Sequence, residues 1–115
     1  MPLHSQEPLS IEQKQGPQPD QHIIVLNGPV VLSTLFPFQT AVRAHTTRLL
    51  VIDFTNVPYM DSAGVGALVG AHVSRNKDGR SLALVGVNSR VRDVLKVTHV
   101  ETLFRFFPSV DEALQ

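Results

Sequence analysis

Residues 49–68 read LLVIDFTNVPYMDSAGVGAL, and the order of apolar, turn-forming and small residues in this stretch indicates the type of fold. Leu49–Phe54 is almost wholly apolar, as expected of a strand buried on both of its faces. Asn56–Pro58 predicts a turn, and either Asp61 or Ser62 then begins a helix. A buried strand followed by a helix is typical of an α/β domain with parallel strands.

The rest of the chain repeats this alternation. Further elements are expected as strands at His22–Asn27, Leu82–Val87 and Leu103–Phe107, and as helices at Thr34–His45, from Asn88 or Ser89 to Val97, and after Ser109, which forms a capping box with Glu112. Residues 1–20 are rich in Gln, Pro and Ser and predict a tail with room for one weak edge strand near Leu9–Gln13. Residues 21–115 predict a single α/β domain with a mixed sheet of four or five strands and about four helices, which cover one or both faces.

The composition excludes several classes of protein. Of the 115 residues, 43% are hydrophobic, as in ordinary globular chains, and the apolar runs are too short to cross a bilayer. Ten basic and ten acidic residues cancel, so no net charge attracts nucleic acid or an anionic membrane. The absence of cysteine, and of a signal sequence in Met1–Ser10, predicts a cytoplasmic protein. The five scattered histidines do not predict a metal site, and no cofactor is expected.

One short motif carries the candidate site. Asp61-Ser62-Ala63-Gly64-Val65-Gly66 follows the buried strand and opens the next helix, where unpaired backbone N–H groups gather. An anion is stabilised there, so a phosphate on Ser62 would lie at the positive end of the helix dipole. The two glycines leave little bulk around the hydroxyl, which lets another protein approach it.

The motif has three other interpretations, of which the first stays open and the other two are disfavoured. Ser62 or Asp61 can be a simple helix cap, with Gly64 and Gly66 serving close packing of the helix. A dinucleotide fingerprint lacks its third glycine, because that position is Val69. A serine hydrolase elbow lacks the glycine two places before Ser62, and no histidine and carboxylate identify themselves as partners, so we expect no enzyme activity.

The strand and motif together resemble the signature of STAS domains, the anti-sigma factor antagonist family. The corresponding positions are an acidic residue at the end of the strand and then Asp-Ser-Ser/Ala-Gly before a helix, here Asp53 and Asp61 to Gly64. The resemblance extends over roughly residues 21–114. It implies an STAS-like fold and a transcription-regulating phosphoprotein that is not itself an enzyme.

The family resemblance also implies partners. The serine matching Ser62 is phosphorylated by a partner that is both an anti-sigma factor and a serine kinase. The unphosphorylated domain holds that partner, the phosphorylated domain releases it, and a phosphatase restores it. The partner surface is expected on Asp61–Gly66 and on the helix Ala63–Ser74, in a protein that is a monomer or a weak dimer.

One segment departs from the family pattern. The turn after His22–Asn27 reads Gly28-Pro29-Val30-Val31, and the acidic residues usual in the family are absent at Pro29 and Val31. This departure favours an alternative function, an STAS-like scaffold subunit of a signalling or lipid-transport complex whose serine is never modified. The apolar residues of this segment form either a docking patch or part of the core; they are Val30, Val31, Leu32, Leu35 and Phe36.

Three further features receive structural interpretations. His72 lies at the edge of an apolar helix face and is expected to be structural. Tyr59 and Met60 are expected to pack beneath the turn. The mixed charged segment of Arg75, Asn76, Lys77, Asp78 and Arg80 predicts a solvated loop, with a binding rim as the alternative.

Overall fold

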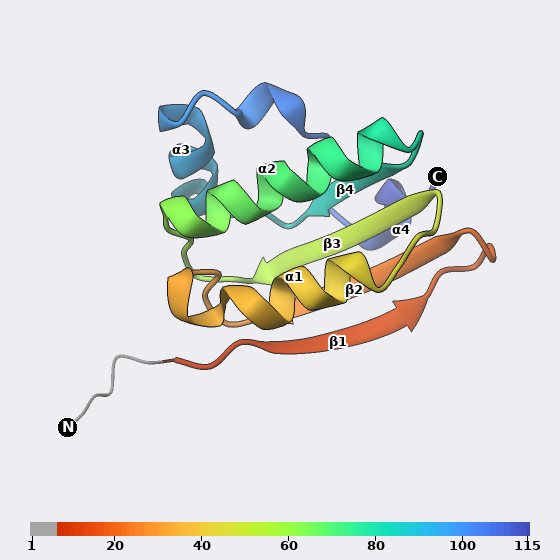
Figure 1. The fold of residues 1–115 in the computed structure, drawn as a ribbon, viewed down its shortest axis with the longest axis horizontal. Coiled ribbons are helices and arrows are strands. Elements are labelled where there is room, and N and C mark those ends of the chain that lie inside the picture. Colours follow the sequence, from red (N-terminus) through yellow and green to blue (C-terminus); the bar gives the residue numbers. More distant parts are fainter. Residues whose placement is uncertain (1–6) are drawn as a thin grey trace.

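The computed structural model describes residues 7–115, and Figure 1 shows its alternation of strands and helices. The strands are β1 (Ser10–Gln15), β2 (Gln21–Asn27), β3 (Leu49–Asn56), β4 (Ser81–Val85) and β5 (Phe106–Phe107). The α-helices are α1 (Leu35–Arg43), α2 (Ser62–Lys77), α3 (Ser89–Val97) and α4 (Val110–Ala113). Two 3₁₀ turns, η1 (Leu32–Thr34) and η2 (Glu101–Leu103), complete the order.

The sheet is mixed, as the sequence predicts. Its strands lie in the order β1-β2-β3-β4-β5, with β1 antiparallel to β2 and every other pair parallel. The weak edge strand expected near Leu9–Gln13 is β1, and its partner β2 begins one residue before the predicted strand. A register irregularity lies between Val25 and Asn27, after which Asn27 pairs with Asn56.

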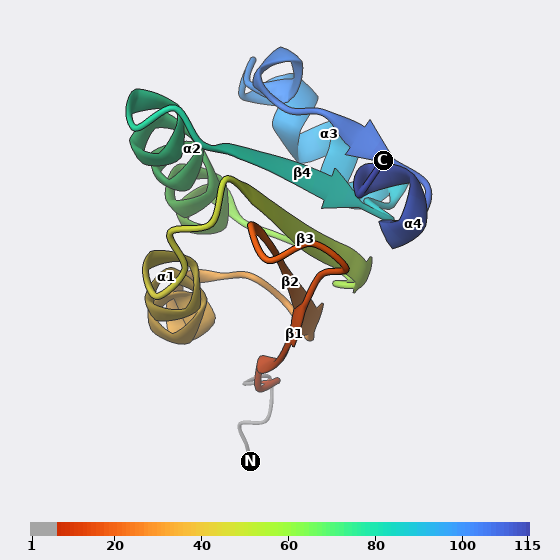
Figure 2. The same ribbon diagram turned by 90° about the vertical axis from the view of Figure 1, so that its right-hand side faces the viewer.

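The helices are divided unequally between the faces of the sheet. Alternate residues of β3, such as Leu50 and Ile52, face a core that also includes Phe38 of α1, Leu68 of α2 and Leu95 of α3. The residues between them on β3 face a second, smaller core closed by α4. Figure 2 shows α1 and α2 on one side of the strands and α4 on the other. Sequence periodicity identified the buried strands but left this division open.

Two predicted strands are wrong in extent. The strand expected at Leu82–Val87 ends at Val85, because Gly86 takes a positive φ of 68° and turns the chain away. The strand expected at Leu103–Phe107 is reduced to β5, because backbone hydrogen bonds from Leu103 and Phe104 close the turn η2 instead. Phe104 then lies buried on the helical face, with its ring edge-on to His72 at 5.4 Å between ring centroids, a packing contact for this histidine.

The predicted solvated loop after α2 is also wrong at Arg75. This residue belongs to α2 and is only 6% exposed. Its guanidinium donates hydrogen bonds to the carbonyl oxygens of His45 (2.8 Å), Ser81 (3.2 Å) and Thr47. Burial lowers the pKa of this guanidinium from its ordinary value. Arg75 therefore ties the C-terminal end of α2 to the segment between α1 and β3 and to the start of β4.

Strand β1 is joined to α1 by a cluster of polar side chains. The imidazoles of His22 on β2 and His45 after α1 stack with 3.4 Å between ring centroids. The Nε2 atom of each ring lies in hydrogen-bond contact with Oε1 of Gln13 on β1, at 3.2 Å for His22. A hydrogen bond to this amide oxygen requires the tautomer in which Nε2 carries the proton. Burial lowers the pKa of both histidines.

Candidate functional site

Ser62 is the first residue of α2, and its side chain is exposed. The helix begins here because Asp61 has extended backbone angles (φ −101°, ψ −177°) and caps it. The backbone N–H of Val65 makes the first bond of the helix, to the carbonyl of Asp61. The amides of Ser62 and Ala63 therefore lie at the positive end of the helix dipole. The hydroxyl of Ser62 is therefore accessible from solvent.

Asp61 holds the two sides of the site together. Its Oδ1 accepts a hydrogen bond from the backbone N–H of Gly64 at 2.9 Å, which is the helix cap. Its Oδ2 accepts another from the backbone N–H of Leu32 at 3.1 Å, in the turn after β2. A parallel bridge between Val30 and Met60 adds a second connection. The start of α2 and the turn after β2 therefore form one rigid corner.

The turn on the other side of this corner is fixed by Thr34. Thr34 directly precedes α1, but its side chain makes no capping hydrogen bond to that helix. Instead its buried hydroxyl donates to the carbonyl of Pro29 at 2.8 Å and accepts from the N–H of Val31 at 3.0 Å. The turn at residues 28–31 is therefore built around a buried threonine whose hydroxyl binds two of its backbone groups.

The two glycines of the motif have different surroundings. A Cβ on Gly64 would lie 2.3 Å from the carbonyl oxygen of Val30, so this glycine serves the close packing of α2 on the turn. A Cβ on Gly66 would meet nothing within 4 Å. Val65 is 5% exposed and belongs to the core. Among the residues of the motif, Ser62 and Gly66 are exposed and Ala63 is partly exposed, whereas Gly64 and Val65 present no side chain to a partner.

The apolar segment after the turn is divided between core and surface. Val30 is fully buried, whereas Leu32 is 73% exposed and Phe36 is 77% exposed. Val31 and Leu35 lie between these extremes. The core interpretation is thus confirmed for Val30, whereas Leu32 and Phe36 lie on the surface, where a docking patch stays a prediction. Apolar periodicity did not separate the two groups because η1 interrupts it. Met60 is buried as expected, and Tyr59 lies under the guanidinium of Arg90, 5.4 Å from the ring centroid.

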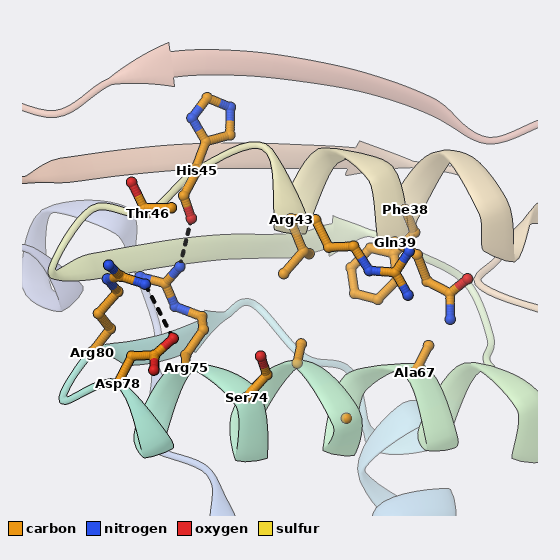
Figure 3. A pocket seen from close by; sticks show the side chains of 13 residues that line it. Phe38, Gln39, Arg43, His45, Thr46, Ala67, Ser74, Arg75, Asp78 and Arg80 are labelled. Carbon is orange, nitrogen blue, oxygen red and sulfur yellow. Dashed lines mark hydrogen bonds and ion pairs between the residues drawn. The ribbon is translucent and has the colours of Figure 1, made fainter.

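A groove of about 350 Å³ lies between α1 and α2 (Figure 3). Phe38 and Val42 line it from α1, and Ala67 and Ala71 from α2. Arg75 and Arg80 lie at one end, where Arg80 contacts Asp78 at 3.3 Å. Among residues 7–115, no three or more His, Cys, Asp or Glu side chains gather in a way that could hold a metal ion. In the same range no helix is both long and apolar enough to span a membrane.

Fold and site together define a small α/β domain that presents a serine at a helix start. The sequence profile of the STAS domain matches residues 10–113. The chain therefore belongs to the STAS domain family.

Named relatives match part of the chain. It is 33% identical over 64 residues to an anti-sigma-B factor antagonist of Staphylococcus aureus, a match that covers 56% of this chain and 59% of that protein. A Staphylococcus epidermidis protein of the same name is 31% identical over 61 residues, covering 53% of this chain and 56% of the relative. The chain thus matches less than two thirds of the length of either relative.

Solved structures share the whole fold. An anti-sigma factor antagonist from Mycobacterium paratuberculosis superposes with a TM-score of 0.80 at 19% identity, covering 92% of this chain and 91% of that one. The phosphorylated form of SpoIIAA, a cell fate determinant of Bacillus, gives 0.70 at 15% identity, with 91% and 96% covered. A sulfate transporter family protein from Wolinella succinogenes gives 0.68 at 27% identity, with 83% and 82% covered.

Proposed function

We propose that this chain is an anti-sigma factor antagonist that binds an anti-sigma factor when Ser62 is unmodified and releases it when Ser62 is phosphorylated. The observation that carries the proposal is the exposed serine at the first residue of α2, in an STAS domain. The names of the Staphylococcus relatives support the partner class. The partner is both an anti-sigma factor and a serine kinase, a phosphatase reverses the reaction, and the chain itself is a cytoplasmic kinase substrate and not an enzyme.

The geometry explains how a phosphate would act on binding. The carboxylate of Asp61 already lies next to Ser62 in the chain, and its two oxygens accept hydrogen bonds from the amides of Gly64 and Leu32. A phosphate on Ser62 adds between about 1.5 and 2 negative charges next to this carboxylate. A partner that closes over the site must desolvate that charge, and each ~1.4 kcal/mol of cost weakens binding about tenfold.

The partner surface is narrower than the motif. It includes Ser62, Ala63 and Gly66, where a neighbouring chain can approach α2 closely. Leu32 extends this surface, since it is exposed and its amide is bound to Asp61. Pro29 and Val31 stand in the same turn where the family usually has acidic residues, so the partner is expected to face this corner with an apolar rather than a basic surface.

The test is phosphorylation by the anti-sigma factor kinase with ATP, followed by mass spectrometry. The chain should gain one phosphate, and Ser62→Ala should abolish it. Ser89→Ala is a matched control, because Ser89 is also the first residue of a helix, after the capping residue Asn88. Ser62→Asp should weaken capture of the kinase about tenfold or more in calorimetry. Phosphorylation that survives in the Ser62→Ala variant would refute the assignment.

A second function is supported by a specific observation. The acidic residues usual in the turn are absent, and a sulfate transporter family protein shares the fold at 27% identity. In this alternative the chain is an STAS-like scaffold subunit of a signalling or lipid-transport complex and Ser62 is not modified. Affinity purification from the native cell separates the two functions. Recovery of non-kinase subunits in equal amounts with the wild type, Ser62→Ala and Ser62→Asp chains supports the scaffold.

A further inference from the structure

The outer edge of β1 has no strand beside it within residues 7–115. β1 is the last strand of the sheet, and its described ladder runs only to β2, from Ser10 opposite Asn27 to Gln15 opposite His22. The backbone N–H and C=O groups that point away from β2 are therefore available to a further strand. Such an edge is a template for pairing with another chain.

A stripe of α1 borders the same edge. Phe36, Thr40 and Ala44 recur every four residues from the start of α1 to the residue that ends it, and all three are exposed. A shallow groove of about 440 Å³ separates this stripe from Ile11 and Gln13 of β1. Phe36 is 77% exposed, which makes it the most exposed large apolar side chain among the described residues. The free edge and the apolar stripe form one continuous surface.

We infer that this surface binds a second copy of the same chain, through antiparallel pairing of the two β1 strands around a two-fold axis at Gln13. Such an axis, perpendicular to the sheet, keeps the helices of both copies on the same side. It places Glu12 of each copy opposite Lys14 of the other, with both side chains on the face away from α1. The two α1 stripes then meet above the new junction.

The charges of β1 favour this register over its neighbours. Centring the axis on Glu12 would oppose Glu12 to itself, and centring it on Lys14 would oppose Lys14 to itself. Like charges directly opposite each other on adjacent strands are destabilising. Charged edge strands normally prevent indiscriminate pairing. The order Glu12-Gln13-Lys14 instead is self-complementary, which selects a partner with the same sequence.

A charge exchange tests the inference independently of Ser62. The wild-type chain is expected to show a reversible monomer–dimer equilibrium in sedimentation up to about 1 mM. Glu12→Lys alone and Lys14→Glu alone each create like-charged pairs across the axis, so each variant should raise the dissociation constant about tenfold or more. An equimolar mixture of the two variants should dimerise again, because each copy then supplies the charge that the other lacks. The double exchange should also restore the dimer.

Glu12→Lys also alters the contact between Glu12 and Asn27, which is 3.0 Å in the structure. The mixture of the two variants distinguishes this local effect from the charge pairing across the axis. Phe36→Glu should also prevent dimerisation, whereas Val97→Glu on α3 is the control, since Val97 is 76% exposed and lies outside the surface. Circular dichroism checks that every variant folds. A wild-type chain that is monomeric at the highest concentration refutes the inference. So does a dimer that both single variants leave unchanged, or a mixture that stays monomeric.

Discussion

The two ends of α2 differ in how a polar side chain binds the backbone around the helix terminus. At the N-terminal end, Asp61 binds two backbone amides and leaves Ser62 exposed. At the C-terminal end, Arg75 is buried and binds three backbone carbonyls. The first arrangement presents a reactive group on a fixed corner, and the second anchors the helix on which that corner stands. The local cap therefore exposes Ser62, and the contacts of Arg75, a clamp at the far end, hold the helix that begins there.

The largest effect is expected from breaking the clamp. Arg75→Met leaves the carbonyls of His45, Thr47 and Ser81 without their donor in a buried site, and should lower the free energy of unfolding by about 3 kcal/mol. Urea unfolding measures the change. Lys77→Met is the control, because this exposed residue of the same turn should change stability by less than about 0.5 kcal/mol. Equal losses in the two variants would contradict the clamp.

The next largest effect distinguishes the two glycines of the motif. Gly64→Ala places a methyl group 2.3 Å from the carbonyl oxygen of Val30, and should lower the free energy of unfolding by about 2 kcal/mol. Gly66→Ala meets open space and removes a flexible residue from a helix, so it should raise stability by about 1 kcal/mol. Thermal unfolding of both variants measures these opposite changes in stability. In the proposed function Gly66→Ala also weakens partner binding, while Ser62 remains exposed.

A smaller effect is expected at the N-terminal corner itself. Asp61→Ala removes the helix cap and the bond to Leu32, and should lower the free energy of unfolding by about 1 kcal/mol. Amide hydrogen exchange of Leu32 should become faster in this variant, because its acceptor is lost. Asp78→Ala, which alters an exposed acid at the other end of α2, should leave that exchange rate unchanged. A protected Leu32 amide in Asp61→Ala would show that the bridge does not fix the turn.

The smallest effect concerns the histidine pair that joins β1 to the helical layer. Burial places the pKa of His22 and His45 in the folded chain below the ordinary value of 6.5, so the unfolded chain takes up protons first as the pH falls. The contribution of the two histidines to the free energy of unfolding is therefore fully present above pH 6.5 and decreases as the pH falls below it. Urea unfolding between pH 7.5 and about 5 should show this slope. The double variant His22→Gln/His45→Gln should flatten it, and an unchanged slope would assign the pH dependence to other groups.

The sequence by itself determined most of the strands and helices and the place of the serine at a helix start. The apolar runs at His22–Asn27 and Leu49–Phe54 predicted β2 and β3 because burial on both faces requires apolar residues at successive positions. Asp61 and Ser62 together predicted the start of α2, because helix capping is a local property of a few consecutive residues, and the structure assigns the cap to Asp61. The exposure of Ser62 follows from that same local geometry.

Only the tertiary structure decided which residues of these elements contact distant parts of the chain. Arg75 resembles its solvated neighbours in sequence, yet the segment after α1 and the start of β4 fold over it. Gly64 and Gly66 are alike in sequence, but only Gly64 lies against the turn after β2. The division of the helices between the two faces of the sheet was likewise decided only by the tertiary structure. Burial depends on contacts between residues far apart along the chain, and local periodicity contains no information about those contacts.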